Sequence, residues 1–420
     1  MKRFRKIFYL LLLILTVQLI FTGCTKKESM TTNQRVTITF WHGMTGQNKT
    51  VLNQLIRDFN HSQSRYKVVG SAQGTFTNLQ QKIMTAAKSG NLPTMSQTTY
   101  TNVPNYVKGN LITPLNTYIS QKDLKTINPV FLKSGQYHNK TYSLPFSKSV
   151  RIMYYNPKLL KKLHLQVPTT WNDIHRAGET AKKHGYTGIV FDQNYASELN
   201  DLIRQTGTPM ISSHLKVTVD SRQALAATHV IWDMLQDKTA TTAGEDGYGN
   251  VKFLAGKTLF YCGSSAAIGV MQASSPKNMI WRTTQLPSYQ GKRATSLAGN
   301  DLVLFKSASS TQRKGAAAFM TYLLKNRQTI KWAEKTGYLP LTTAATHDRQ
   351  YQHYLAQHPQ FRAASKSLDN SFSDPAFLGY NQYLSALEST TDSLATTTIT
   401  PEKAMSRLQQ QAETIINQNQ

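Results

Sequence analysis

Residues 142–155 read YSLPFSKSVRIMYY, and this stretch decides how the chain is divided into domains. Tyr142–Phe146 and Val150–Tyr155 are rich in aromatic and branched residues, which favour strands. We predict that they form two strands that cross out of a first domain into a second. Asn156, with a proline after it, is expected to open the next helix.

The segment upstream alternates predicted strands with predicted helices. Val36–Phe40 alternates as a strand does, and Tyr66–Gly70 is expected to form a second strand. Two runs of apolar residues have helical spacing: Val51, Leu52, Leu55, Ile56 and Phe59, then Leu79, Ile83, Met84 and Ala87. This alternation predicts an α/β domain with a largely parallel sheet.

The segment downstream continues with helices and strands. Thr170-Trp-Asn-Asp173 resembles a capping box, which marks the start of a helix. Leu302–Phe305 is expected to be a strand, and the helix after it carries apolar residues at Ala317, Phe319, Met320, Leu323 and Leu324. The tail from Pro401 is expected to form an amphipathic helix through Met405, Leu408, Ala412, Ile415 and Ile416.

The first 24 residues, MKRFRKIFYLLLLILTVQLIFTGC, have the pattern of a secretory signal. Because Cys24 follows a small residue, the segment resembles a lipoprotein signal that is cut before Cys24, whose thiol then carries diacylglycerol. An uncleaved anchor is the alternative, but the apolar run is short for a span of about 20 residues. We therefore expect a signal at 1–23, a flexible tether at 24–35, and a protein that is lipid-anchored to the outer face of the cell membrane.

Composition limits the classes of partner and site. The chain has 420 residues and a net charge of +26. A chain of this length is too long for one hydrophobic core and suits two domains. The basic residues are scattered singly, so we expect a solvated surface and no nucleic-acid partner. With Cys24 lipidated only Cys262 remains, which excludes an intrachain disulfide and a thiolate-pair metal site. Cys262 is expected to be buried. We also expect a monomeric protein that needs no cofactor or metal.

The sequence lacks the motifs that carry common catalytic chemistry. It contains no G-x-S-x-G, H-E-x-x-H or P-loop pattern. Glu245-Asp246 is a carboxylate pair that a secreted glycan hydrolase could use. Adjacent side chains point apart, however, and the glycines around them predict a surface loop. We expect a protein that is not an enzyme.

Eight short segments occur in an order and spacing that spans nearly the whole chain after the signal. They are Ile38–His42, Phe59-Asn60, Pro93-Thr94, Tyr154–Asn156, Val167–Trp171, Phe253–Lys257, Leu297–Asn300 and Lys335–Pro340. Together they resemble the extracellular solute-binding proteins (family 1) of ABC importers, which include maltose-binding and glycerol-3-phosphate-binding proteins. Phe40–Met44 and Thr336–Pro340 are more similar to the glycerol-3-phosphate branch.

The resemblance implies a two-lobed periplasmic-binding-protein-like α/β fold of type II, with lobes joined by crossing hinge strands. Lobe 1 would contain 36–146 plus 298–345, and lobe 2 would contain 150–296 plus 346–420. Such lobes close on a small-molecule solute by hinge motion and deliver it to an ABC permease in the membrane. Catalytic groups are not needed, because ATP is hydrolysed on other subunits.

The resemblance also implies ligand-binding positions. These are Phe76, where the branch has tyrosine, Tyr100, where it has an acid, Ser149, Ser264, Ser265, Gly299 and Tyr338. Ser264 and Ser265 could instead cap a helix, and Tyr338 could instead be a core residue. The branch has a phosphate-binding arginine near Phe377–Gly379, where this chain has none, so Arg151 or Arg282 would have to replace it.

The expected solute is thus a small polyol-phosphate that resembles glycerol-3-phosphate, or a sugar. An oligosaccharide-binding protein of the same fold is the main alternative. A lipoprotein that adheres to anionic wall polymers is an alternative from another class.

Overall fold

The computed structural model describes residues 35–396 and 398–419, and Val36–Gln420 forms one compact unit. The predicted signal at 1–23, the lipidation site Cys24 and all of the tether except Arg35 lie outside the described residues. Within the described part of the chain, no helix is both long and apolar enough to span a bilayer.

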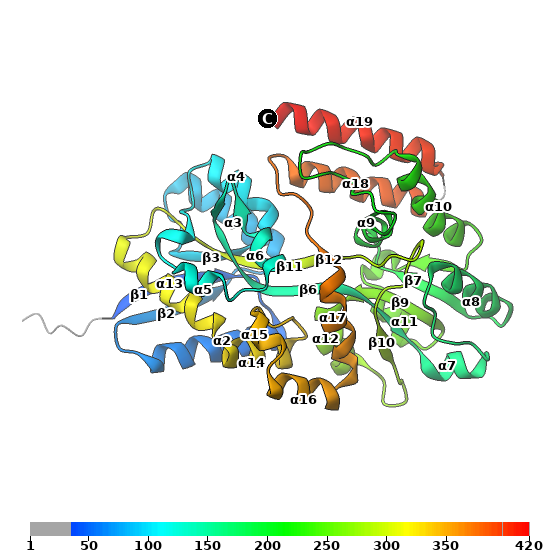
Figure 1. Ribbon diagram of the computed structural model, residues 1–420, viewed down its shortest axis with the longest axis horizontal. Helices are drawn as coiled ribbons and strands as arrows, with labels where there is room; N and C mark the ends of the chain where they lie inside the picture. Colours follow the sequence, from blue (N-terminus) through cyan, green and yellow to red (C-terminus); the bar gives the residue numbers. More distant parts are fainter. Residues whose placement is uncertain (1–34, 397, 420) are drawn as a thin grey trace, which may run out of the picture. The chain divides into compact units, whose positions relative to one another are not determined.

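One mixed sheet organises the described residues (Figure 1). Its strand order is β2-β1-β3-β11-β6-β9-β7-β8, with β10 on β6 and β12 on β11. The strands are β1 (Val36–His42), β2 (Tyr66–Ala72), β3 (Met95–Thr98), β6 (Ser143–Tyr155), β7 (Thr187–Phe191), β8 (Ala240–Thr242), β9 (Thr258–Ser264), β10 (Arg282–Thr284), β11 (Thr295–Leu304) and β12 (Ser371–Phe372). A separate hairpin contains β4 (Gln136–Tyr137) and β5 (Lys140–Thr141).

Helices surround the two ends of this sheet. The first group contains α2 (Gly46–Ser62), α3 (Phe76–Ser89), α4 (Val103–Lys108), α5 (Gln121–Leu124), α6 (Pro129–Ser134), α13 (Ser310–Leu324), α14 (Asn326–Thr336), α15 (Thr343–Thr346), α16 (Arg349–Gln357) and α17 (Arg362–Ser367). The second contains α7 (Pro157–Lys162), α8 (Trp171–Lys183), α9 (Ala196–Gln205), α10 (Arg222–Gln236), α11 (Asn250–Leu254), α12 (Ile268–Ser274), α18 (Tyr380–Ala395) and α19 (Pro401–Asn419).

Strand β6 connects the two ends of the sheet (Figure 1). Residues 143–150 pair antiparallel with β11, and 151–155 pair antiparallel with β9. The prediction of two strands here is wrong, because β6 runs unbroken through Ser147–Ser149. These three polar residues stay extended because β11 pairs with them, with Gly299 opposite Lys148.

The prediction of a largely parallel sheet is correct for part of the structure. Strand β1 is parallel to β2 and β3, and β7 is parallel to β8 and β9. Strand β11, however, is antiparallel to both β3 and β6. The sheet is therefore mixed, and its antiparallel strands lie where the two parallel parts meet.

The local predictions from apolar spacing are largely confirmed. All five apolar residues predicted for the first helix are buried on α2, and the predicted face of α13 is buried too. In α3, Leu79 and Ile83 are buried as predicted, whereas Met84 is exposed and Ala86 is buried in place of the half-buried Ala87. Helix α8 begins with a capping box in which Thr170 and Asp173 satisfy each other's backbone N–H groups.

The first of the two larger hydrophobic clusters extends from one end of the sheet into β9, α11 and α12, and the second lies at the other end. The first includes β1, α2, α13 and α14, and the second includes β7, α8, α10 and α19. Strand β6 contributes Phe146 and Tyr154 to the first and Met153 to the second. Since the clusters share this strand, the residue limits given above for two lobes stay a prediction.

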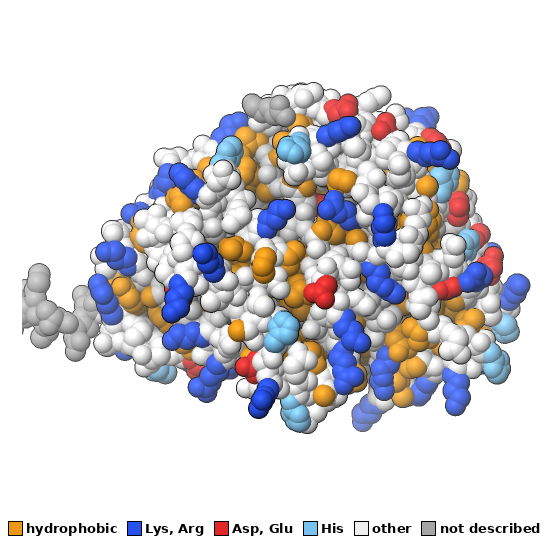
Figure 2. Space-filling view, in the orientation of Figure 1, with side chains coloured by type: hydrophobic (Ala, Val, Ile, Leu, Met, Phe, Trp, Pro, Cys, Tyr) orange, Lys and Arg blue, Asp and Glu red, His pale blue; other side chains and the backbone are white. Residues whose placement is uncertain are grey.

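Basic side chains are spread singly over the face shown in Figure 2, with few acidic ones among them. This distribution agrees with the large positive net charge of the chain. On this face the charge forms no single dense patch.

Candidate functional site

A cavity of about 790 Å³ lies between elements from the two ends of the sheet. One wall comes from η1 (Tyr100–Asn102), α6 and the β4–β5 hairpin, and the other from α9, the loop 209–213 and the segment 371–376. Of the predicted ligand residues, Tyr100 lines this cavity. This volume is in the range of small-molecule sites, about 300–1,000 Å³.

A buried ion pair, Lys148–Asp301, lies next to Tyr100. The Lys148 Nζ lies 2.6 Å from an Asp301 carboxylate oxygen, donates to Ser134 Oγ at 3.2 Å, and lies 5.3 Å from the centre of the Tyr100 ring. Ser143 Oγ donates to the other Asp301 oxygen at 2.6 Å. Because a buried charge without its partner is costly, this group fixes the wall that Tyr100 forms. Sequence reasoning missed Lys148, although a lysine inside an apolar strand was a usable signal.

The structure brings the three predicted serines together where β6, β9 and η4 (Ser265–Ala267) meet. Ser264 Oγ donates to Ser149 Oγ at 3.2 Å and accepts the Ala266 N–H at 3.2 Å, so Ser264 caps η4. Ser265 Oγ accepts the Val150 N–H at 3.3 Å. Ser149 and Ser265 are almost fully buried, and these bonds hold η4 against β6.

Gly299 lies opposite Lys148 in the pairing of β11 with β6. Its φ of +106° is in the region that favours glycine, and a Cβ atom there would lie 1.7 Å from the Ser147 carbonyl oxygen. The backbone geometry alone therefore requires glycine at this position.

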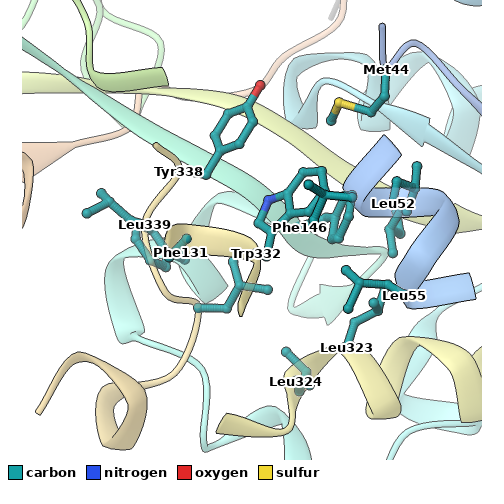
Figure 3. Packing of buried hydrophobic residues seen from close by; sticks show 14 of the residues in the cluster. Met44, Leu52, Leu55, Phe131, Phe146, Leu323, Leu324, Trp332, Tyr338 and Leu339 are labelled. Carbon is teal, nitrogen blue, oxygen red and sulfur yellow. The ribbon is translucent and has the colours of Figure 1, made fainter. Parts of the chain in front are cut away.

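Tyr338 reaches the same stretch of β6 through its neighbour, since the Leu339 N–H donates to the Lys148 carbonyl at 2.8 Å. Its ring is buried and stacks on Trp332, with centroids 5.8 Å apart and planes at 6°. In Figure 3 its hydroxyl is directed away from Leu339 and Phe131. Burial raises the pKa of Tyr338 to about 12. The ring is therefore part of the first hydrophobic cluster.

Phe76 lies apart from these residues. It lines a smaller cavity of about 170 Å³ together with Gln97, Thr98 and Asn102. Its ring also packs beside Gly43, where an added Cβ would approach it to 3.0 Å.

The two arginines proposed as anion partners lie outside the larger cavity. Arg151 on β6 is buried, forms an ion pair with Glu198, and donates from Nη2 to Asp192 at 3.0 Å and to the Cys262 carbonyl at 3.3 Å. Burial raises the pKa of Glu198 to about 7. Arg282 is exposed on β10, where Nη1 donates to the Trp281 carbonyl at 3.1 Å.

Arg204 on α9 does line the cavity, and nothing in its sequence context distinguished it from the other arginines. Its guanidinium carbon lies 5.1 Å from the centre of the Phe372 ring. The acid on the same wall is Asp374, which accepts from Asn200 Nδ2 at 2.9 and 3.1 Å and from the Tyr380 hydroxyl at 3.4 Å. Burial raises the pKa of Asp374.

The residues considered for catalysis or metal binding are not assembled into a site. Glu245 and Asp246 are exposed on η3 (Gly244–Asp246). Cys262 is buried and free, as expected. Across the described residues, no group of three or more His, Cys, Asp or Glu side chains is arranged to hold a metal ion.

Comparisons with known proteins place this geometry in context. Residues 54–362 match a family model described as "Bacterial extracellular solute-binding protein". The sn-glycerol-3-phosphate-binding periplasmic protein UgpB of Brucella melitensis is 26% identical over 343 residues, which are 77% of this chain and 78% of the relative. The resemblance to extracellular solute-binding proteins that was inferred from short segments is thereby confirmed over most of the chain.

Solved structures share the fold. UgpB from Mycobacterium tuberculosis, solved in complex with glycerophosphocholine, matches with a TM-score of 0.82 and 18% identity, and covers 92% of this chain and 99% of its own. The cyclic alpha-maltosyl-1,6-maltose binding protein from Arthrobacter globiformis matches with a TM-score of 0.83 and 20% identity, over 92% of this chain and 100% of its own. The two-lobed α/β fold class is therefore confirmed.

Replacement of Gly299 by alanine tests the close approach of β11 to β6. We expect Gly299→Ala to lower the free energy of unfolding by about 3 kcal/mol or more, because the new Cβ meets backbone that cannot move aside. Gly291→Ala is the matched control, since Gly291 also has positive φ (+74°) but has open space around it, so only about 1 kcal/mol should be lost. Urea denaturation without ligand measures both, and equal losses would contradict the account.

Two substitutions at Tyr338 separate its ring from its hydroxyl. Tyr338→Ala should lower the free energy of unfolding by about 3–5 kcal/mol, because the ring that stacks on Trp332 is lost. Tyr338→Phe keeps that ring and should leave stability unchanged. Thermal unfolding of the ligand-free protein measures both variants, and a stable Tyr338→Ala protein would show that the ring is not a core element.

Proposed function

The chain belongs to the bacterial extracellular solute-binding proteins, and on this premise we propose that it captures a small polyol-phosphate or sugar and delivers it to an ABC permease. The observation that carries this proposal is the cavity whose two walls come from opposite ends of the sheet. A solute that touches both walls stabilises the closed arrangement by the contacts it makes only there. Binding without turnover is all that this role requires.

The comparisons support a polyol-phosphate ahead of an oligosaccharide. The Brucella melitensis relative is named for glycerol-3-phosphate, and the Mycobacterium tuberculosis structure holds glycerophosphocholine. The Arthrobacter globiformis neighbour is named for a cyclic oligosaccharide, which keeps that class as the second candidate. The proposed ligand-binding positions are those implied by the resemblance: Phe76, Tyr100, Ser149, Ser264, Ser265, Gly299 and Tyr338.

We also propose that the protein is held at the outer face of the cell membrane by diacylglycerol on Cys24. The support is the sequence of residues 1–24, with its basic start, apolar run and terminal cysteine. Anchoring would keep the binding protein beside its permease and raise its local concentration there.

Calorimetric titration distinguishes the candidate solutes. We expect binding heat with glycerol-3-phosphate or glycerophosphocholine, and weaker or no heat with maltotriose. The resemblance implies that the Tyr338 hydroxyl contacts the solute, so Tyr338→Phe should weaken the binding of the phosphate ester about 3- to 10-fold. Glu245→Gln is the control on a distant surface loop and should bind as the wild type does.

Three results would contradict this function. Heat from maltotriose alone would favour the oligosaccharide reading. Release of reducing sugar from glycans that disappears in Glu245→Gln would favour a hydrolase. Salt-sensitive binding to wall polymers, with no heat from any small solute, would favour an adhesion protein.

The lipid anchor has its own test in cells grown with labelled palmitate. We expect label on the wild-type protein and its recovery in the membrane fraction. Cys24→Ala should remove the label and release the protein from the membrane, because the thiol is the site of acylation. Cys262→Ala is the matched control and should keep both properties. Label retained by Cys24→Ala would contradict the proposal.

A further inference from the structure

We propose that Arg204 binds the anionic group of the captured solute, with Lys133 on the opposite wall as the second cation. The ligand class is then a phosphate ester. This inference rests on the proposed function, since it concerns the same cavity and names the chemistry that selects the solute.

The protein holds the guanidinium of Arg204 in place but leaves its N–H donors without a hydrogen-bond acceptor among the described residues. The Phe372 ring holds it at 5.1 Å, and within the described residues it makes no hydrogen bond or ion pair. Its N–H donors are therefore available in a half-buried position that lines the cavity. A planar guanidinium with free donors binds phosphate oxygens in pairs, and its stacking on an aromatic ring reduces the entropy lost on binding.

Asp374, on the same wall, attracts Arg204 electrostatically but forms no hydrogen bond or ion pair with it among the described residues; burial raises the pKa of this carboxyl, and the charge of Arg204 opposes that rise. Both Asp374 oxygens accept from Asn200 Nδ2, and one also accepts from the Tyr380 hydroxyl. The other arginines considered for this role differ from Arg204. Arg151 is paired with Glu198 and Asp192, and Arg282 lies exposed on β10 away from the cavity.

The opposite wall adds positive charge. Lys133 on α6 lines the cavity, is exposed, and forms no ion pair among the described residues. His138 on the β4–β5 turn lines the same cavity. Asp374 is the single acidic residue of the lining, so the cavity carries a net positive charge. A phosphate between Arg204 and Lys133 would contact both walls, which couples anion recognition to closure.

Titration calorimetry with glycerol-3-phosphate, glycerol and maltotriose tests this inference. Arg204→Gln should weaken glycerol-3-phosphate binding about 10- to 100-fold, because a charged hydrogen bond is lost. Arg282→Gln is the matched control, since it removes the same charge outside the cavity and should bind as the wild type does. Lys133→Gln should weaken binding about 3- to 10-fold at low salt, and less at high salt.

Each other outcome has a defined meaning. If Arg204→Gln folds, as judged by circular dichroism, and binds glycerol-3-phosphate as Arg282→Gln does, the inference is overturned. If Arg204→Gln does not fold, Lys133→Gln decides, and wild-type affinity in that variant overturns the inference. If the wild type binds maltotriose but no phosphate ester, the inference fails while solute capture stands. If no solute binds, the proposed function fails as well.

Discussion

The pairing of β6 with β11 is the interaction on which the rest of the structure depends. Strand β6 is buried along its whole length except at Tyr155, and it gives side chains to both of the larger hydrophobic clusters. Gly299 lets β11 approach the Ser147 carbonyl, and Lys148 and Asp301 form an ion pair close to that point. The ligand residues proposed on β6, β9, η4 and the Tyr338 turn are all held by contacts with this one strand.

Charges in this protein fall into two groups with different roles. Lys148 and Arg151 are buried on β6 and are matched by carboxylates, so they stabilise the junction and would be costly to leave unpaired. Arg204 and Lys133 lie in the walls of the cavity and form no ion pair among the described residues. The first group maintains the geometry on which the second group depends, and only the second is free to bind a solute.

Local patterns in the sequence were sufficient for helices such as α2, α8 and α13 and for the first strands of the sheet. The five apolar residues of α2 and the cap at Thr170 depend on neighbours within a few positions, and both were predicted correctly. The continuity of β6 through Ser147–Ser149 could not be predicted, because it depends on pairing with β11, about 150 residues away. The burial of Tyr338 on Trp332 and the place of Arg204 in the cavity also depend on tertiary contacts. The resemblance identified positions near β6 but could not separate those that hold the backbone from those that face a solute.

The central claim is that a phosphate ester is captured between the two walls of the cavity. A crystal structure of the protein grown with glycerol-3-phosphate tests this claim most directly. The account predicts the phosphate within hydrogen-bond distance of the Arg204 guanidinium, with the glycerol directed toward Tyr100. An empty cavity in a protein saturated with this solute, or a ligand bound away from both walls, would contradict it.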